Sequence, residues 1–101
     1  LEDYCASMID PLVRYDRMNH TNLIETLDVY MAHNGSLQET AQKLFIHRNI
    51  VNYKLKKIES ILDIKLSDFR HRAELECALL AYKLVTIQKR KKVSGYVAGV
   101  H

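Results

Sequence analysis

Five basic side chains gather between residues 36 and 58, in a stretch that holds one acid, Glu39. The five are Lys43, Arg48, Lys54, Lys56 and Lys57, so the stretch carries a net charge of +4. Localised positive charge suits the binding of a polyanion, because cations neutralise phosphates and release their counterions. Two amides among these cations, Asn49 and Asn52, have the donors and acceptors that hydrogen-bond base edges. The chemistry that these residues offer is recognition of nucleic acid.

The rest of the chain shows that this charge is concentrated. The whole chain carries +3, but residues 1–35 carry −4, residues 59–88 carry −1 and residues 89–101 carry +4. A basic run can also serve only to solvate one face of a helix, and charge alone does not separate that alternative from DNA binding. The predicted secondary structure of the charged stretch distinguishes DNA binding from a solvated helix face.

Between residues 36 and 62 the pattern predicts two helices joined by a tight turn. Ser36, followed three residues later by Glu39, forms a capping box and starts a helix that reaches Leu44. After a break at Phe45-Ile46-His47, apolar residues recur at helical spacing: Val51, Leu55, Ile58 and Leu62. This pattern is typical of a helix-turn-helix, which places its second helix, here about residues 47–62, in the major groove of DNA.

The second helix has a polar face opposite its apolar stripe. That face holds four side chains, which are Asn49, Asn52, Tyr53 and Lys56. Arg48 lies in the first turn, where a long side chain still reaches outward, and Lys54 and Lys57 flank the face. We expect base-edge or phosphate contacts from Arg48, Asn49, Asn52 and Tyr53, and phosphate contacts from the three lysines.

Other positions of the unit have more than one interpretation. His47 is expected to cap the second helix, either alone or while it also contacts DNA. Tyr53 is either a DNA contact or a half-buried aromatic side chain. On the first helix, phosphate contacts are expected from Gln38, Thr40 and Lys43, where that helix crosses the DNA strand.

The turn and the preceding helix support this pair. Phe45 occupies the turn position at which glycine is usual, and we expect Phe45 and Ile46 to form a hydrophobic plug beneath the turn, at some cost in backbone strain. Upstream, Thr21 or Asn22 is expected to cap a supporting helix that ends in left-handed conformation at Asn34-Gly35.

The sequence predicts an all-α fold, a small helical bundle that contains a trihelical helix-turn-helix unit and an added long C-terminal helix. Lead-in helices occupy residues 1–19, with Asp10-Pro11 expected to start the second of two. The helix-turn-helix core spans residues 20–66, the long helix residues 67–90 and a flexible basic tail residues 91–101. The long helix is apolar on two sides, one with Leu75, Leu79 and Tyr82, the other with Cys77, Leu80, Leu84 and Ile87. We expect both sides to be buried, in part against a second copy.

Several functional classes are disfavoured. The chain has no Ser/His/Asp or Cys/His arrangement, paired-carboxylate motif or glycine-rich phosphate loop, so no enzyme is expected. Neither the histidines nor Cys5 and Cys77 have metal-ligand spacing, so no cofactor is expected, and both cysteines are expected to be buried and reduced. No apolar run approaches the ~20 residues that cross a bilayer and no signal peptide is visible, which predicts a cytoplasmic protein without a membrane partner. The start at Leu1 suggests a piece of a longer polypeptide.

The stretch GSLQETAQKLFIHRNIVNYKLKKIESILDIKLSD resembles the C-terminal helix-turn-helix domain of the PucR/CdaR family of bacterial transcriptional regulators. That family typically carries a T-A-x-x-L-F-[VI]-H-R-N-T motif followed by Y-R-L-x-x-I-E, and the resemblance extends over roughly residues 8 to 85. It implies a Fis-type helix-turn-helix and a parent protein whose N-terminal sensory region binds a small-molecule effector, such as a purine-pathway compound or a sugar diacid. The chain departs from the pattern at Ile50, where Thr can bind a phosphate, and at Asn52, where Arg can read guanine.

The residues and the resemblance together predict a sequence-specific DNA-binding domain of a bacterial transcriptional regulator. Its expected partners are double-stranded DNA and a second copy of the chain, in a homodimer. The alternative is a helical protein-interaction or dimerisation module of a regulator, whose basic face meets an acidic protein.

Overall fold

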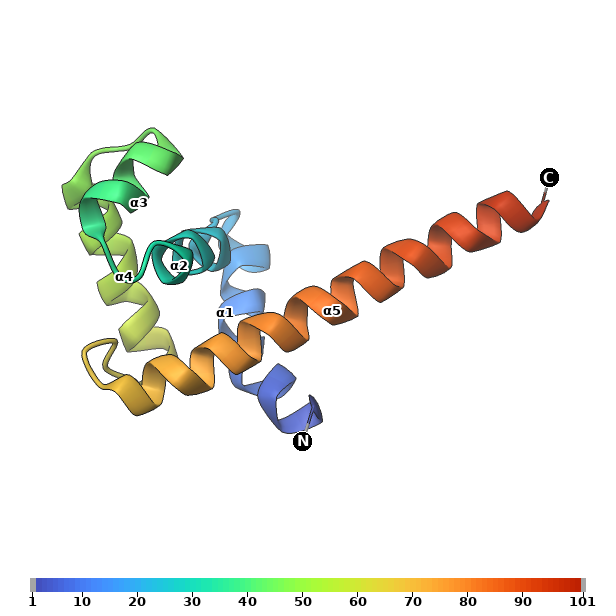
Figure 1. The fold of residues 1–101 in the computed structure, drawn as a ribbon, viewed down its shortest axis with the longest axis horizontal. Helices are drawn as coiled ribbons and strands as arrows, with labels where there is room; N and C mark the ends of the chain where they lie inside the picture. Colours follow the sequence, from blue (N-terminus) through green and yellow to red (C-terminus); the bar gives the residue numbers. More distant parts are fainter. Residues whose placement is uncertain (1, 101) are drawn as a thin grey trace.

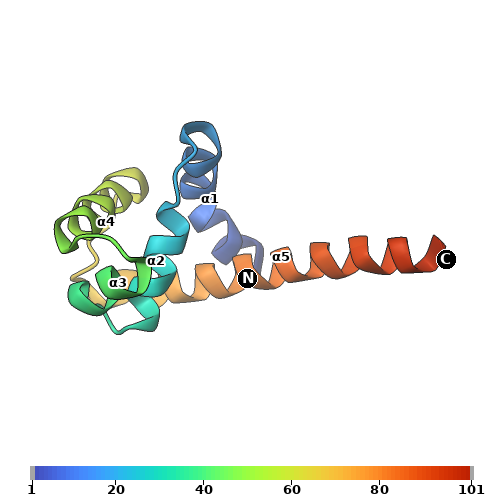
Figure 2. The same ribbon diagram turned by 90° about the horizontal axis from the view of Figure 1, so that it is seen from above.

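The computed structural model describes the backbone of residues 2–100 and the side chains of residues 7–89. Five helices follow in the order α1 (Glu2–Asn19), α2 (Leu23–Ala32), α3 (Leu37–Leu44), α4 (Arg48–Leu62) and α5 (Phe69–Val100). No strand occurs in this part of the chain, so the predicted all-α bundle with a trihelical unit and a long C-terminal helix is confirmed. Helices α2, α3 and α4 group together, and the C-terminal half of α5 extends beyond the rest of the molecule (Figures 1 and 2).

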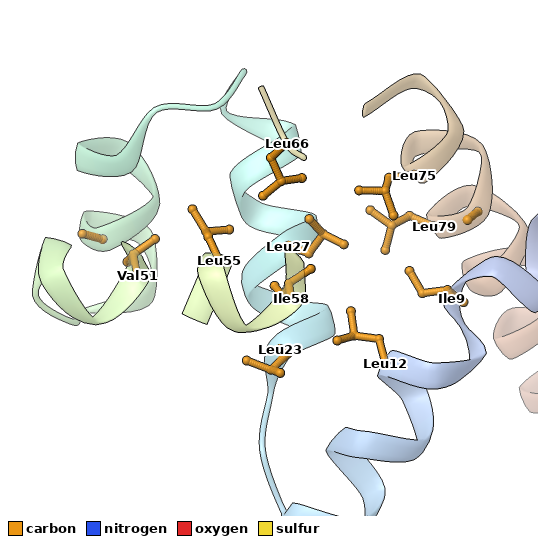
Figure 3. Close-up of a cluster of buried hydrophobic side chains, with 12 residues drawn as sticks. Ile9, Leu12, Leu23, Leu27, Val51, Leu55, Ile58, Leu66, Leu75 and Leu79 are labelled. Carbon is orange, nitrogen blue, oxygen red and sulfur yellow. The ribbon is translucent and has the colours of Figure 1, made fainter. Parts of the chain in front are cut away.

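One apolar core joins all five helices, and its larger side chains are drawn in Figure 3. Its buried members are Ile9, Leu12, Leu23, Leu27, Ala41, Val51, Leu55, Ile58, Leu66, Leu75, Ala78 and Leu79. Every helix thus contributes a face to a single interior, which removes apolar surface from water and fixes the helices relative to one another. The orientation of α4 therefore depends on the whole bundle.

Helix α1 is continuous, and the prediction of two lead-in helices is wrong. Pro11 lies inside α1, where a proline removes one backbone hydrogen bond and disfavours the helix. The residues on either side of it offset this cost, because Ile9 and Leu12 are both buried in the core. Tertiary packing of these neighbours therefore keeps α1 helical at Pro11, although local propensity favours a helix start there.

The start of α2 is capped by a side chain from α1. Asn22 occupies the N-cap position without a side-chain hydrogen bond of its own. The Asp16 carboxylate instead accepts hydrogen bonds from the backbone N–H groups of Leu23 at 2.8 Å and Ile24 at 2.9 Å, and from the Thr21 hydroxyl at 2.6 Å. A negative charge at a helix N-terminus is favourable, so Asp16 ties α1 to the helix that supports the α3–α4 pair. At the other end of α2, Asn34 and Gly35 have positive φ values of 55° and 80°, as expected.

Within the described part of this chain, helix α5 is buried on one side, and the expected burial of its other side against a second copy stays a prediction. Leu75 and Leu79 lie in the core, whereas Leu80, Leu84 and Ile87 are exposed. The reason is that α1 is the helix packed extensively on α5, and one helix covers one side. Cys77 is likewise exposed, contrary to prediction, while Cys5 lies outside the described side chains. Where a flexible tail was expected from residue 91, the helix continues to Val100.

Candidate nucleic-acid interface

Helix α3 begins at the predicted capping residue. The Ser36 hydroxyl accepts a hydrogen bond from the backbone N–H of Glu39 at 3.1 Å. The reciprocal half of the capping box is replaced, because the backbone N–H of Ser36 donates to the carbonyl of His33 at 3.1 Å. The Glu39 carboxylate lies 3.8 Å from Nδ1 of the same histidine. The start of α3 is therefore fixed to the end of α2.

The turn between α3 and α4 is closed by Phe45 in left-handed conformation, with φ 58° and ψ 40°. The backbone N–H groups of Phe45 and Ile46 donate to the carbonyls of Gln42 at 3.3 Å and Ala41 at 3.1 Å. The predicted plug is only half right: Ile46 packs against the core, but the Phe45 side chain is 94% exposed. A left-handed residue at a helix C-terminus reverses the chain, and here it directs Phe45 outward while Ile46 faces inward.

Helix α4 begins at Arg48 and is capped by His47, as predicted. His47 has extended backbone conformation, and its Nδ1 accepts a hydrogen bond from the backbone N–H of Asn49 at 3.0 Å. The backbone carbonyl of His47 accepts the first helical hydrogen bonds, from Ile50 at 2.9 Å and Val51 at 3.2 Å. A capped first turn holds the side chains that follow it in defined directions.

The two faces of α4 are separated as its periodicity predicts. Val51, Leu55 and Ile58 are buried in the core. Five exposed polar side chains lie on the opposite face and in the first turn, which are Arg48, Asn49, Asn52, Tyr53 and Lys56, and Ile50 and Ser60 are exposed as well. The Tyr53 side chain is 68% exposed, so the half-buried alternative for this aromatic is wrong. We call these five residues the α4 outer face.

Lys54 and Lys57 lie at the edges of α4, where both contact neighbouring helices. The Lys54 ammonium donates a hydrogen bond to Oδ1 of Asn22 at 2.7 Å. The Lys57 ammonium lies 5.4 Å from the centroid of the Tyr15 ring, within cation–π range. The structure thus separates these two lysines from Lys56, which is exposed on the α4 outer face.

Helix α3 contributes two of its three predicted phosphate contacts to the surface. Gln38 and Lys43 are exposed. Thr40 is fully buried, and its hydroxyl donates to the backbone carbonyl of Ser36 at 2.6 Å. The expectation that Thr40 meets a phosphate is therefore wrong, because its position on α3 faces the core.

A shallow hollow between α3 and the start of α4 brings together residues from both helices. It is lined by Gln38, Ala41, Gln42, Phe45, Ile46, His47 and Arg48. Gln42 and Phe45 were not among the predicted contacts. Phe45 carries a sequence signal in retrospect, because a non-glycine residue at the turn directs its side chain outward when it adopts left-handed conformation. Gln42 carries none.

Other kinds of site are missing from the part of the chain that the structure describes. No group of three or more His, Cys, Asp or Glu side chains there is placed to hold a metal ion. None of its helices is both long and apolar enough to span a membrane.

Comparison with known protein families shows which family this arrangement of helices belongs to. The model of the PucR C-terminal helix-turn-helix domain matches residues 23–81, more than half of the chain. The chain belongs to this family. The match runs from the start of α2 into α5 and is shorter than the expected 8 to 85, so α1 lies outside it. The PucR domain is thus the α2–α4 unit together with the first part of α5, and it is a DNA-binding domain of transcriptional regulators.

Several of the relatives that the chain matches are named as regulators. The proline-responsive transcriptional activator PutR of Bacillus subtilis is 40% identical over 68 residues, 67% of this chain and 16% of that protein. The purine catabolism regulatory protein of the same species is 37% identical over 65 residues, 64% of this chain and 12% of that protein. The carbohydrate diacid regulator of Escherichia coli is 36% identical over 70 residues, 68% of this chain and 18% of that protein. The chain therefore spans less than a fifth of each, and no solved structure matches it.

Proposed function

We propose that this PucR domain binds double-stranded DNA with sequence specificity by inserting α4 into the major groove. The observation that carries the proposal is the α4 outer face, which presents five exposed polar side chains opposite the buried side of a capped helix. A helix held in this way by the rest of a bundle can enter a groove without reorganising the protein.

The proposed roles follow from position on the helix. Arg48 and Asn49 occupy the first turn, the end that normally points deepest into the groove, and with Asn52 and Tyr53 they contact base edges or phosphates. Lys56 contacts a phosphate, and Lys54 and Lys57 contribute positive charge from the edges. On the approach side, further contacts to the DNA backbone come from His47, Gln38, Lys43 and Phe45.

The proposal extends to the protein that carries this domain. We infer a bacterial transcriptional regulator of the cytoplasm, a homodimer on an inverted repeat whose half-sites lie about one helical turn, roughly 34–36 Å, apart. The printed names of its relatives concern proline, purines and carbohydrate diacids. A small metabolite that binds outside this chain is therefore the expected kind of effector.

Selection of bound sequences from a random duplex library tests the proposal. A DNA-reading domain enriches one motif, and its binding to random duplex weakens steeply as salt rises. The alternative, a protein-interaction module whose basic face meets an acidic protein, binds random duplex only weakly at low salt and enriches no motif. Failure to enrich a motif would contradict sequence-specific recognition.

A further inference from the structure

Helix α5 carries a second apolar surface on the side that faces away from the core. Five exposed residues form it, namely Ala73, Cys77, Leu80, Leu84 and Ile87, and we call them the outer stripe. At about 100° per residue they lie roughly opposite the buried Leu75 and Leu79. Leu80, Leu84 and Ile87 are 59%, 49% and 49% exposed. Contiguous apolar surface of this kind marks an interaction site.

The spacing of the outer stripe specifies what covers it. Its members follow one another at intervals of four, three, four and three residues. This is the a/d pattern of a heptad repeat, in which side chains of one helix pack into the gaps between those of a second helix. A helix with the same period would therefore cover the outer stripe, and α5 of a second copy provides one.

We propose that two copies of this chain dimerise by packing their α5 helices against each other, antiparallel, along the outer stripe. This inference rests on the proposed function, to which it adds the interface of the homodimer. Identical helices paired in this way are related by a two-fold axis, the symmetry of an inverted DNA repeat.

Charge selects the antiparallel arrangement. Residues 72–76, at the N-terminal end of the outer stripe, hold Arg72, Glu74 and Glu76 and carry a net charge of −1, whereas residues 89–92, which follow its C-terminal end in the sequence, carry +4. An antiparallel pair places the −1 segment of each helix beside the +4 segment of the other. A parallel pair would place two runs of +4 side by side, where like charges repel. Lys83, beside the centre of the stripe, is paired with Asp28 at 2.6 Å, which offsets its charge at the two-fold axis.

The shape of the molecule leaves room for the second helix. Helix α1 packs on α5, whose buried residues Leu75 and Leu79 lie opposite the outer stripe, and Ala73 at the N-terminal end of the stripe lines a hollow with residues of α2. The C-terminal half of α5 projects from the body in both views (Figures 1 and 2). It carries Ile87, and the other four members of the stripe are exposed on the half of α5 beside the body. Heptad register in an antiparallel pair places a positions opposite d positions. Leu80 then faces Leu84 of the second copy, and Cys77 faces Ile87 of the second copy.

Sedimentation equilibrium of this chain tests the interface. The wild type is expected to give the mass of a dimer, and Leu84→Glu the mass of a monomer with unchanged far-ultraviolet circular dichroism. Val85→Glu is the matched control, because Val85 is 42% exposed on the same helix but lies off the outer stripe. It should remain a dimer. A monomeric wild type at every concentration, or a dimeric Leu84→Glu, would overturn the proposal.

Cysteine crosslinking tests the orientation. In a Cys5→Ser background, Ile87→Cys pairs with Cys77 of the second copy in an antiparallel dimer and gives a disulfide-linked species on mild oxidation. The Cys5→Ser parent, with Cys77 alone, should remain uncrosslinked. Crosslinking of that parent at the same protein concentration indicates a parallel pair and overturns the arrangement.

Titration with DNA that carries a single half-site keeps this inference separate from DNA binding. Leu84→Glu should bind a single half-site with wild-type affinity and lose the added affinity for the inverted repeat. A wild type that dimerises but binds no DNA contradicts the proposed function and leaves the interface standing. A monomeric wild type that binds DNA contradicts the interface alone.

Discussion

His47 fixes the start of α4 through its own ring, because Nδ1 accepts a hydrogen bond from the backbone N–H of Asn49 at 3.0 Å. A ring nitrogen that accepts carries no proton, so the neutral imidazole holds its proton on Nε2. His47 therefore combines two properties that can be separated: a capping acceptor for α4 and a second donor next to the residues proposed to read DNA.

Substitution of His47 separates these properties. His47→Ala should lower the free energy of unfolding by about 0.5–2 kcal/mol, because the cap is lost. His47→Ser supplies another capping oxygen and should restore most of that stability. Denaturant unfolding and DNA titration of both variants measure the two effects. We expect His47→Ser to bind DNA more weakly than wild type; equal affinity would mean that His47 acts as a cap alone.

Asp16 should contribute to the stability of the supporting helix α2. Asp16→Ala removes the acceptor for the N–H groups of Leu23 and Ile24 and should cost about 1–3 kcal/mol in thermal unfolding. Asp16→Asn keeps one acceptor oxygen and should fall between wild type and Asp16→Ala. Unchanged stability of Asp16→Ala would contradict the capping role, whereas DNA affinity below the unfolding transition should be unaffected by either variant.

Phe45 is expected to lower the stability of the domain and to raise its affinity for DNA. A side chain in left-handed conformation costs about 1–2 kcal/mol, so Phe45→Gly should be more stable than Phe45→Ala by about 1 kcal/mol. The two variants lack the same ring and differ only in the β-carbon, which isolates the backbone effect. Both should lose DNA affinity equally if the exposed ring contacts DNA. Wild-type affinity in both would remove Phe45 from the interface.

Interactions between neighbouring residues are the ones that the sequence predicts well. The caps at Ser36 and His47 each join residues three or fewer apart, so the residue types alone indicate them. The Asp16 cap joins residues seven and eight apart and depends on how α1 meets α2, which no local pattern contains. The prediction of a helix start at Pro11 is wrong for the same reason, since tertiary packing of its neighbours outweighs the local preference.

The predicted site shows the same contrast between what local sequence determines and what tertiary packing determines. Angular position on one helix correctly separated the exposed Asn49 and Tyr53 from the buried Val51. It did not exclude Thr40, whose burial depends on packing between helices, and it did not reveal that Leu80, Leu84 and Ile87 stay exposed among the described side chains. Periodicity shows which residues share a face, and only the assembled bundle shows what covers that face.

Lys56 should contribute to affinity without contributing to specificity. Lys56→Ala removes one proposed phosphate contact and should lower the slope of log affinity against log salt by about 1 on any duplex. Lys65→Ala removes the same charge from an exposed position after α4 and is the control. Fluorescence anisotropy over a salt series gives both slopes. A loss that depends on the DNA sequence would instead assign Lys56 to base reading.

The most direct test of the central claim is the affinity of Arg48→Ala for the duplex that the wild-type domain enriches from a random library. If the start of α4 reads DNA, fluorescence anisotropy at fixed salt should show a loss of about 1–3 kcal/mol on that duplex. Arg70→Ala, which removes the same charge beyond the far end of α4, should bind as wild type does. Wild-type affinity of Arg48→Ala would contradict the placement of α4 in the major groove.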